Sequence, residues 1–320
     1  MVHDRLAPDS LPPVARSRRS RQTRRPLSRR VVAITGGARG LGLAMAEAIS
    51  ARGAHVALGD LDADLAAAEA AKLPSGAIGL SLDVTDPRSF KTFIETVEER
   101  LGPVDALVNN AGIMVCEPFL DEPESLTRRQ IEINVHGVIT GMRLVIPGMQ
   151  RRRTGHVINI ASAAGKVGVA GEAVYVATKH AVVGLSEAVR YELLGTGVEL
   201  SVVMPGLANT ELASGMSAGR GVKLVEPEEV AAAVVGTLEQ PRFEVYVPGS
   251  LGPLFRFAAV LPRSARDLMN RMFQTDQIAT KVDKTARAMY AARASSGMPP
   301  VDPPPPPSDP EQRVMETEAS

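Results

Sequence analysis

The sequence predicts an α/β protein, with a doubly wound, seven-stranded parallel sheet in a single domain that carries a helical C-terminal extension. Short apolar runs alternate with helical stretches from residue 31 onward, a pattern typical of a parallel sheet covered by helices on both faces. A glycine-rich turn joins the first apolar run to the first helical stretch. Right-handed crossovers between successive strands then produce a doubly wound arrangement.

The expected elements follow from local composition in chain order. The first strand is a β-branched run, and an Ala/Leu/Met-rich stretch after the glycine turn predicts a helix to Arg52, which ends at Gly53. Strands are expected at Val31–Thr35, His55–Asp60, Ala77–Asp83, Val104–Asn110, His156–Ser162, Val198–Pro205 and Phe243–Pro248. Further helices are expected at 62–72, 86–101, 124–152, 173–194 and 227–239.

Charge is distributed unevenly along the 320 residues, although the formal net charge is zero. Residues 1–30 hold nine arginines against two acids, whereas residues 296–320 hold one arginine against five acids. The length alone allows two domains of roughly 150 residues each, but one series of strands runs through the body of the chain. The expected organisation is a disordered basic head (1–30), a catalytic domain (31–249), a helical extension of that domain (250–295) and a disordered Pro-rich tail (296–320).

The two end segments leave alternatives open. The basic head also has the composition of an organelle-targeting segment, or of a region translated from a start codon placed too early. Residues 251–262 are apolar and residues 263–293 are basic and amphipathic. This extension predicts a cap on the core or a subunit interface, with a lid over an apolar substrate pocket or peripheral membrane contact as the alternatives.

Composition also limits the classes of function. The single cysteine excludes an intramolecular disulfide and a multi-cysteine zinc site, and it suits a reducing, cytoplasmic location. The five histidines show no metal-ligand spacing, so we expect no bound metal. No apolar run approaches the roughly 20 residues of a spanning helix. The body of the chain is close to neutral, so we expect no nucleic-acid partner.

The glycine-rich turn predicts a dinucleotide site. Gly36, Gly40 and Gly42 lie between a strand and a helix, where glycines let backbone N–H groups approach a pyrophosphate at a helix N-terminus. Asp60 ends the second strand, at about the spacing of an acid that binds the adenosine ribose. Its carboxylate favours NAD over NADP because it repels a 2′-phosphate, although Arg39 in the turn has the charge to attract one.

A tyrosine and a lysine predict acid–base chemistry. Tyr175 has Lys179 four residues further along an expected helix, which places both side chains on one face. A tyrosine pKa is about 10, and a nearby ammonium group favours the phenolate. The pair is therefore suited to act as a general base near neutral pH.

Together these motifs resemble the short-chain dehydrogenase/reductase family from Val31 to about Gly249, in both their order and their separation. The motifs are Thr35–Gly42, Asp83-Val84, Asn109–Gly112, Asn134–Gly137, Ser162, Tyr175 with Lys179, and Pro205-Gly206 with Thr210. The resemblance implies a Rossmann-type NAD(P)-binding catalytic domain. It also implies an oxidoreductase that acts on CH–OH donors.

The resemblance implies four catalytic residues. Tyr175 would exchange a proton with the substrate oxygen, and Ser162 would hydrogen-bond that oxygen. Lys179 would hold the nicotinamide ribose and lower the Tyr175 pKa. Asn134 would kink its helix and anchor a water that links Lys179 to solvent.

The resemblance also implies the cofactor contacts, with an adenine-side group, a glycine turn and a nicotinamide-side group. The expected contacts are Gly36, Arg39, Gly40, Leu41, Gly42, Asp60, Leu61, Asp83, Val84, Asn110, Ala111, Gly112, Tyr175, Lys179, Pro205, Gly206, Ala208 and Thr210. Cys116, His136 and His180 are interpreted as packing residues.

The substrate is less well defined. The apolar extension suggests, by analogy with relatives, a hydrophobic secondary alcohol or its ketone, handled by a homodimer or homotetramer. One alternative is an NADPH-dependent carbonyl or ketoacyl reductase, which Asp60 disfavours. Another is a catalytically inactive dinucleotide-binding scaffold, which the complete set of catalytic residues disfavours.

Overall fold

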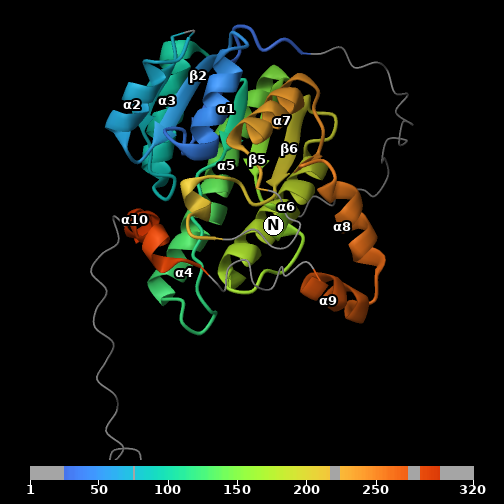
Figure 1. The fold of residues 1–320 in the computed structure, drawn as a ribbon. Coiled ribbons are helices and arrows are strands. Elements are labelled where there is room, and N and C mark those ends of the chain that lie inside the picture. The colour runs from blue at the N-terminus through green and yellow to red at the C-terminus, as the bar shows by residue number, and fades with distance from the viewer. Residues whose placement is uncertain (1–24, 75, 217–223, 273–281, 296–320) are drawn as a thin grey trace, which may run out of the picture.

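A computed structural model describes residues 25–74, 76–216, 224–272 and 282–295, and Figure 1 shows its parallel sheet between two layers of helices. The strand order is β3-β2-β1-β4-β5-β6-β7, with every neighbouring pair parallel. The strands are β1 (Val31–Thr35), β2 (His55–Asp60), β3 (Ile78–Ser81), β4 (Ala106–Asn109), β5 (Gly155–Ile160), β6 (Val198–Pro205) and β7 (Glu244–Val247). The predicted fold class is confirmed.

The sheet is covered on both faces because alternate residues of each buried strand point in opposite directions. Val32 and Ile34 of β1 face α1 (Gly40–Ser50), α2 (Ala63–Ala70) and α7 (Pro227–Glu239). Val31 and Ala33 belong to the opposite core. That core is covered by α3 (Pro87–Leu101), α5 (Gly137–Arg152) and, towards β6, α6 (Ala173–Glu192). The strand order reverses between β1 and β4, so their carboxyl ends open the crevice where such sheets bind ligands.

The single helix expected over 124–152 is divided into three parts. It consists of α4 (Glu124–Ile131), a π-helical turn η1 (Glu132–His136) and α5. Asn134 lies in the π turn with 1% of its surface exposed. Such turns inside α-helices frequently mark functional sites, and here the turn places Asn134 against the crevice.

Residues 25–30, which we assigned to the disordered head, pack on the body of the protein instead. Leu27 is 3% exposed and belongs to the core on the α1 face. Arg25 donates through its backbone N–H to the Glu239 carbonyl at 2.9 Å, and its side chain pairs with Glu199 at 2.9 Å. The boundary at residue 30 was therefore wrong for these residues, because composition could not show that Leu27 has a place in the core. Residues 1–24 and the tail at 296–320 lie outside the described residues.

In the described part of the expected helical extension, the chain forms three helices. They are α8 (Leu251–Val260), α9 (Arg263–Met272) and α10 (Lys284–Ser295). The Phe255 ring of α8 lies 5.8 Å from the Tyr246 ring of β7. In Figure 1, α8 and α9 project from one side of the body, whereas α10 lies beside α4, where Arg129 Nε donates to the Ala294 carbonyl at 3.0 Å. Among the described residues, no helix combines the length and apolar character needed to cross a membrane.

Candidate active site

The turn between β1 and α1 can be formed only by glycine at its critical positions. Gly36 has φ +62°, a left-handed conformation that other residues rarely adopt. A Cβ atom on Gly42 would lie 2.0 Å from the Gly36 carbonyl oxygen. The turn is therefore so tight that its backbone, and not a side chain, forms the surface that faces the crevice.

Two polar side chains fasten this turn to the end of β4. Asn110 Nδ2 donates to the carbonyls of Thr35 at 2.9 Å and Gly36 at 3.0 Å. In return, the Thr35 hydroxyl accepts from the backbone N–H groups of Asn110 at 3.0 Å and Ala111 at 2.9 Å. The ends of β1 and β4 are thereby held together, and Asn110 and Ala111 lie beside the turn. Their contact with the cofactor, which the resemblance implies, stays a prediction.

The N-terminus of α1 suits a bound anion. The helix begins at Gly40, its N-cap residue Arg39 makes no side-chain capping hydrogen bond, and its first turn contains no acidic residue. The first N–H groups of a helix have no partner within the helix, and they carry partial positive charge. A pyrophosphate at this position would satisfy them, so the glycine turn and the helix start fit a dinucleotide.

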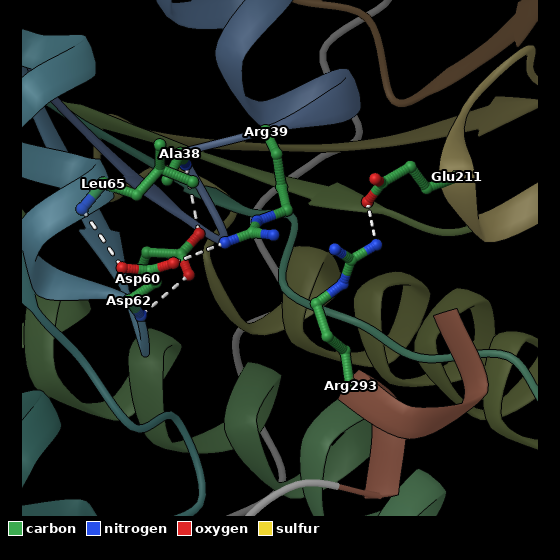
Figure 2. Close-up of polar contacts among 7 residues, drawn as sticks. All are labelled: Ala38, Arg39, Asp60, Asp62, Leu65, Glu211 and Arg293. Atoms are coloured by element: carbon green, nitrogen blue, oxygen red, sulfur yellow. Dashed lines mark hydrogen bonds and ion pairs between the residues drawn. The ribbon is translucent and has the colours of Figure 1, made fainter. Parts of the chain in front are cut away.

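The end of β2 presents a carboxylate to the same turn. Asp60 accepts from the backbone N–H of Ala38 at 3.1 Å and of Asp62 at 3.2 Å. Figure 2 shows the Arg39 guanidinium turned towards Asp60 and Asp62, and it pairs with the Asp62 carboxylate at 2.8 Å. The side chains of Arg39 and Asp62 are 36% and 49% exposed, so this pair is screened by solvent. Leu61 is 59% exposed between the two acids.

The two residues after β3 that were expected to contact adenine have different surroundings. The Asp83 carboxylate accepts from the Thr85 backbone N–H at 2.9 Å and the Thr85 hydroxyl at 2.7 Å, which closes a local turn. Val84 is buried, and a Cβ on Gly137 would lie 3.1 Å from its side chain. An adenine contact by this pair stays a prediction.

Asn134 connects the π turn to the loop after β4 and to α6. Its Oδ1 accepts from the Ile113 N–H at 2.9 Å, and its Nδ2 donates to the Ile113 carbonyl at 2.9 Å. Nδ2 also donates to the Thr178 hydroxyl at 3.1 Å, and that hydroxyl donates to the Tyr175 carbonyl at 2.7 Å. Asn134 therefore fixes the start of α6 relative to the crevice.

Ser162, Tyr175 and Lys179 come together beyond the carboxyl end of β5. Ser162 precedes the 3₁₀ turn η2 (Ala163–Gly165), and its hydroxyl accepts from the Ala164 N–H at 3.1 Å. Lys179 Nζ donates to the Ile160 carbonyl at 3.1 Å and lies 5.5 Å from the centre of the Tyr175 ring. Tyr175 and Lys179 are both buried in this arrangement.

Burial dominates the protonation of this group. It raises the pKa of Tyr175 well above its ordinary value, the Glu172 carboxylate raises it further, and a hydrogen bond with Ser162 opposes both effects. Burial also lowers the pKa of Lys179 to about 8. Burial is therefore the largest influence on the Tyr175 pKa here, and the lowering by Lys179 that the sequence predicts stays a prediction for the protein with its cofactor bound.

The loop after β6 approaches the glycine turn from the other side. The Gly206 N–H donates to the Val247 carbonyl at 2.7 Å, and Ala208 forms a parallel bridge with Val225. A Cβ on Gly40 would lie 3.8 Å from the Thr210 side chain. The structure thus brings Thr210 beside the start of α1, on the side of the crevice that faces away from Asp60.

Sequence reasoning missed two residues of α10 that reach the site. Arg287 donates to the carbonyls of Leu212 at 2.8 Å, Ser214 at 3.2 Å and Met114 at 2.6 Å. The Tyr290 hydroxyl accepts from the Met114 N–H at 2.8 Å. No local signal could have identified them, because Met114 lies more than 170 residues away in the sequence.

Glu172 was also missed. It is 3% exposed and lies just before α6, three residues from Tyr175, a spacing that could have suggested a shared helix face. Burial raises the pKa of its carboxyl to about 7, and the nearby charge of Arg287 opposes that shift.

A family model described as "short chain dehydrogenase" matches residues 30–221. The 1-deoxy-11-beta-hydroxypentalenate dehydrogenase of Streptomyces exfoliatus is 34% identical over 69% of this chain and 83% of its own length. The sorbitol dehydrogenase of Cereibacter sphaeroides is 37% identical over 58% of this chain and 73% of its own length. The glycine betaine reductase ATRR of Emericella nidulans is 34% identical over 72% of this chain, which spans 19% of that longer protein.

Among solved structures, a short chain dehydrogenase/reductase from Burkholderia phymatum in complex with NAD matches with a TM-score of 0.68. The match covers 73% of this chain and 94% of that one at 24% sequence identity. It agrees with the sheet order and the layers of helices described above.

Proposed function

The chain belongs to the short chain dehydrogenase family of oxidoreductases, and on that premise we propose that it interconverts a hydrophobic secondary alcohol and its ketone with NAD. The observation that carries the proposal is the meeting of Ser162, Tyr175 and Lys179 beside a glycine turn and a helix N-terminus that fit a dinucleotide. When bound, NAD would supply the nicotinamide ring that accepts a hydride from the carbinol carbon of the substrate.

The residues of the chain supply position and proton transfer. Tyr175 takes the proton of the substrate hydroxyl during oxidation and returns it to the carbonyl oxygen during reduction. Ser162 hydrogen-bonds the same oxygen and stabilises the alkoxide-like charge as it develops. Lys179 adds positive charge beside the phenolate, and Asn134 positions the helix that carries both residues.

NAD is favoured over NADP by two features of the glycine turn. The Asp60 carboxylate is held against the turn by the Ala38 and Asp62 N–H groups, where it would repel a 2′-phosphate. Arg39, the cation that could attract that phosphate, is engaged by Asp62. NAD is also bound by the solved relative from Burkholderia phymatum.

An apolar substrate is supported by the side chains around Tyr175. Met114, Cys116 and Ala164 form a buried cluster with it, and Leu212 and Met216 pack against this cluster. The names of two relatives, a 1-deoxy-11-beta-hydroxypentalenate dehydrogenase and a sorbitol dehydrogenase, point to substrates of different polarity, so the proposal rests on the local apolar cluster. We place the enzyme in the cytoplasm as a homodimer or homotetramer, in keeping with its single cysteine and its family.

The test is oxidation of a panel of alcohols that varies in chain length and ring size, followed by nicotinamide absorbance. Wild-type protein is expected to turn over apolar secondary alcohols with NAD, and Tyr175→Phe is expected to abolish turnover while it binds NAD with a similar dissociation constant. Turnover that survives Tyr175→Phe would refute the catalytic assignment. NAD binding without turnover across the panel would favour the inactive scaffold.

A further inference from the structure

Glu172 is a buried acid without a strong partner. Its side chain is enclosed at 3% exposure, and it makes no capping hydrogen bond to the first turn of α6. Among the described residues, the hydrogen-bond partner found for its carboxylate is the Cys116 thiol, with Sγ 4.0 Å from Oε1. A thiol is a weak donor, so the carboxylate keeps most of its acceptor capacity. Buried polar groups of this kind are usually paired, which makes Glu172 an exception that requires an explanation.

The electrostatic surroundings of Glu172 are set by its burial and by one nearby cation. Arg287 of α10 is the nearby cation that lowers the pKa of the carboxyl, but its guanidinium already donates to the carbonyls of Leu212, Ser214 and Met114. Burial is the larger effect and brings the pKa to about 7. The other titratable groups facing this region are Cys116, Glu117 and Glu122 of the loop after β4, Tyr175 of α6 and Tyr290 of α10.

The side chains packed around Tyr175, the neighbour of Glu172 on the next turn, are mostly apolar. The cluster around Tyr175 contains Met114, Cys116 and Ala164, with Val169, Val176, Leu212, Met216 and Val282 packed against it. An alcohol with one hydroxyl would satisfy Tyr175 and leave the carboxylate desolvated beside it. A substrate with a second hydroxyl group could pair with the carboxylate, and sites that hold a buried polar group discriminate strongly against analogues that leave it unpaired.

We propose that Glu172 is a specificity residue that accepts a hydrogen bond from a second hydroxyl group of an otherwise apolar diol, whose first hydroxyl is oxidised at Tyr175. This inference rests on the proposed function. Arg287 and Tyr290 fasten α10 to Met114 of the apolar cluster around Tyr175. The reaction remains a two-electron oxidation of one carbinol by NAD, and the second hydroxyl only binds.

The experiment compares cyclohexanol with trans-1,2-cyclohexanediol, which differ by one hydroxyl group on the same apolar ring. Wild-type protein is expected to show a kcat/KM for the diol at least tenfold above that for cyclohexanol. Glu172→Leu should reduce this ratio to about one or below, and Glu172→Gln should give an intermediate ratio because the amide oxygen still accepts. Glu187→Gln, an exposed position on the same helix, is the matched control and should keep the wild-type ratio.

A binding measurement separates recognition from chemistry and from folding. In Tyr175→Phe protein with NAD bound, calorimetry should show the diol binding at least tenfold more tightly than cyclohexanol, and Glu172→Gln should reduce that difference. Equal kcat/KM values for the two alcohols, or a ratio that Glu172 variants do not change, would overturn this inference and leave the proposed function standing. An absence of Tyr175-dependent oxidation of any alcohol would overturn both.

Discussion

The side of the site that faces the cofactor is built from the backbone of adjoining loops, whereas the side that covers Tyr175 is built from side chains that come from distant segments. On the cofactor side, Asn110 and Asp60 fasten the glycine turn through main-chain groups of Thr35, Gly36 and Ala38. On the substrate side, Arg287 of α10 joins the loops after β4 and β6.

The two sides also differ in how far their charged side chains are exposed to solvent. The Arg39–Asp62 pair on the cofactor side is partly exposed, and so is the pair between Glu211 and Arg293 that Figure 2 shows on the opposite side of Arg39. Arg287 and Glu172 on the substrate side are 7% and 3% exposed. Exposed pairs contribute little to stability, whereas buried charges are costly unless they are paired. The cofactor side should therefore be sensitive to shape, and the substrate side to charge.

The largest effect on cofactor binding is expected from adding one methyl group to the glycine turn. In Gly42→Ala the new Cβ would lie 2.0 Å from the Gly36 carbonyl oxygen, so the turn must open and the first N–H groups of α1 must move. We expect the dissociation constant for NAD to rise at least 100-fold, measured by calorimetry. Gly184→Ala is the control, because nothing lies within 4 Å of its Cβ and alanine favours a helix. Unchanged NAD binding in Gly42→Ala would show that the glycine turn and the N-terminus of α1 do not hold the pyrophosphate.

The next effect tests the substrate side by removing the cation of α10. Arg287→Leu leaves the carbonyls of Met114, Leu212 and Ser214 without their donors, and hydrogen bonds from charged groups are worth about 1.5–3 kcal/mol each. We expect a loss of unfolding free energy on the order of 4 kcal/mol and a more than tenfold fall in kcat/KM for the alcohol. Thermal unfolding and steady-state kinetics measure these quantities.

The control for that variant is Arg293→Gln, which removes the half-exposed pair with Glu211 on the same helix. Its expected cost is below about 1 kcal/mol after allowance for solvent screening. If Arg287→Leu and Arg293→Gln lose the same free energy of unfolding, then the buried arginine of α10 contributes no more than the exposed one. The proposed difference between the cofactor side and the substrate side would then be wrong.

The same contrast explains how much could be predicted from the sequence. The glycine turn, Asp60 and the Tyr175/Lys179 pair were predicted because each depends on spacing within one short segment. The resemblance implied a kink at Asn134, but its π-helical form was not predicted, because it accompanies hydrogen bonds to Ile113, 21 residues earlier.

The α10 contacts could not be predicted at all. A basic amphipathic stretch is consistent with a solvated helix, and nothing in it marks Arg287 as the one arginine that meets three carbonyls from two distant loops. Leu27 was misassigned for a similar reason, since the local sequence of an arginine-rich segment does not indicate that this leucine is buried in the core.

A smaller effect should appear in the pH dependence of stability. Burial raises the pKa of Glu172 from 4.5 to about 7 in the folded protein, so the folded state holds the proton more tightly than the unfolded chain. Its stabilising contribution is complete below pH 4.5 and is lost as the pH rises to about 7, which corresponds to about 3 kcal/mol. Glu172→Gln removes the ionisable group, so it should be more stable than wild type at pH 8.

Thermal unfolding at pH 5 and pH 8 measures this difference. The advantage of Glu172→Gln over wild type should shrink at pH 5, where both carboxyl and amide are uncharged in the folded state. An advantage that is the same at both pH values would mean that the Glu172 carboxyl is not desolvated. Glu187→Gln, at an exposed position of α6, should show no such pH dependence.

The smallest effect is expected on the cofactor side, where charge is partly exposed. Asp62→Asn removes the partner of Arg39 but keeps an N-cap for α2, because asparagine can still accept from the Leu65 N–H. The freed guanidinium can then meet a 2′-phosphate, although Asp60 still repels it. We expect the dissociation constant for NADP to fall by about fivefold, which is about 1 kcal/mol, with that for NAD unchanged. If NADP binding does not respond to Asp62→Asn but does respond to Asp60→Ala, then Asp60 alone selects the cofactor and the Arg39–Asp62 pair has no part in it.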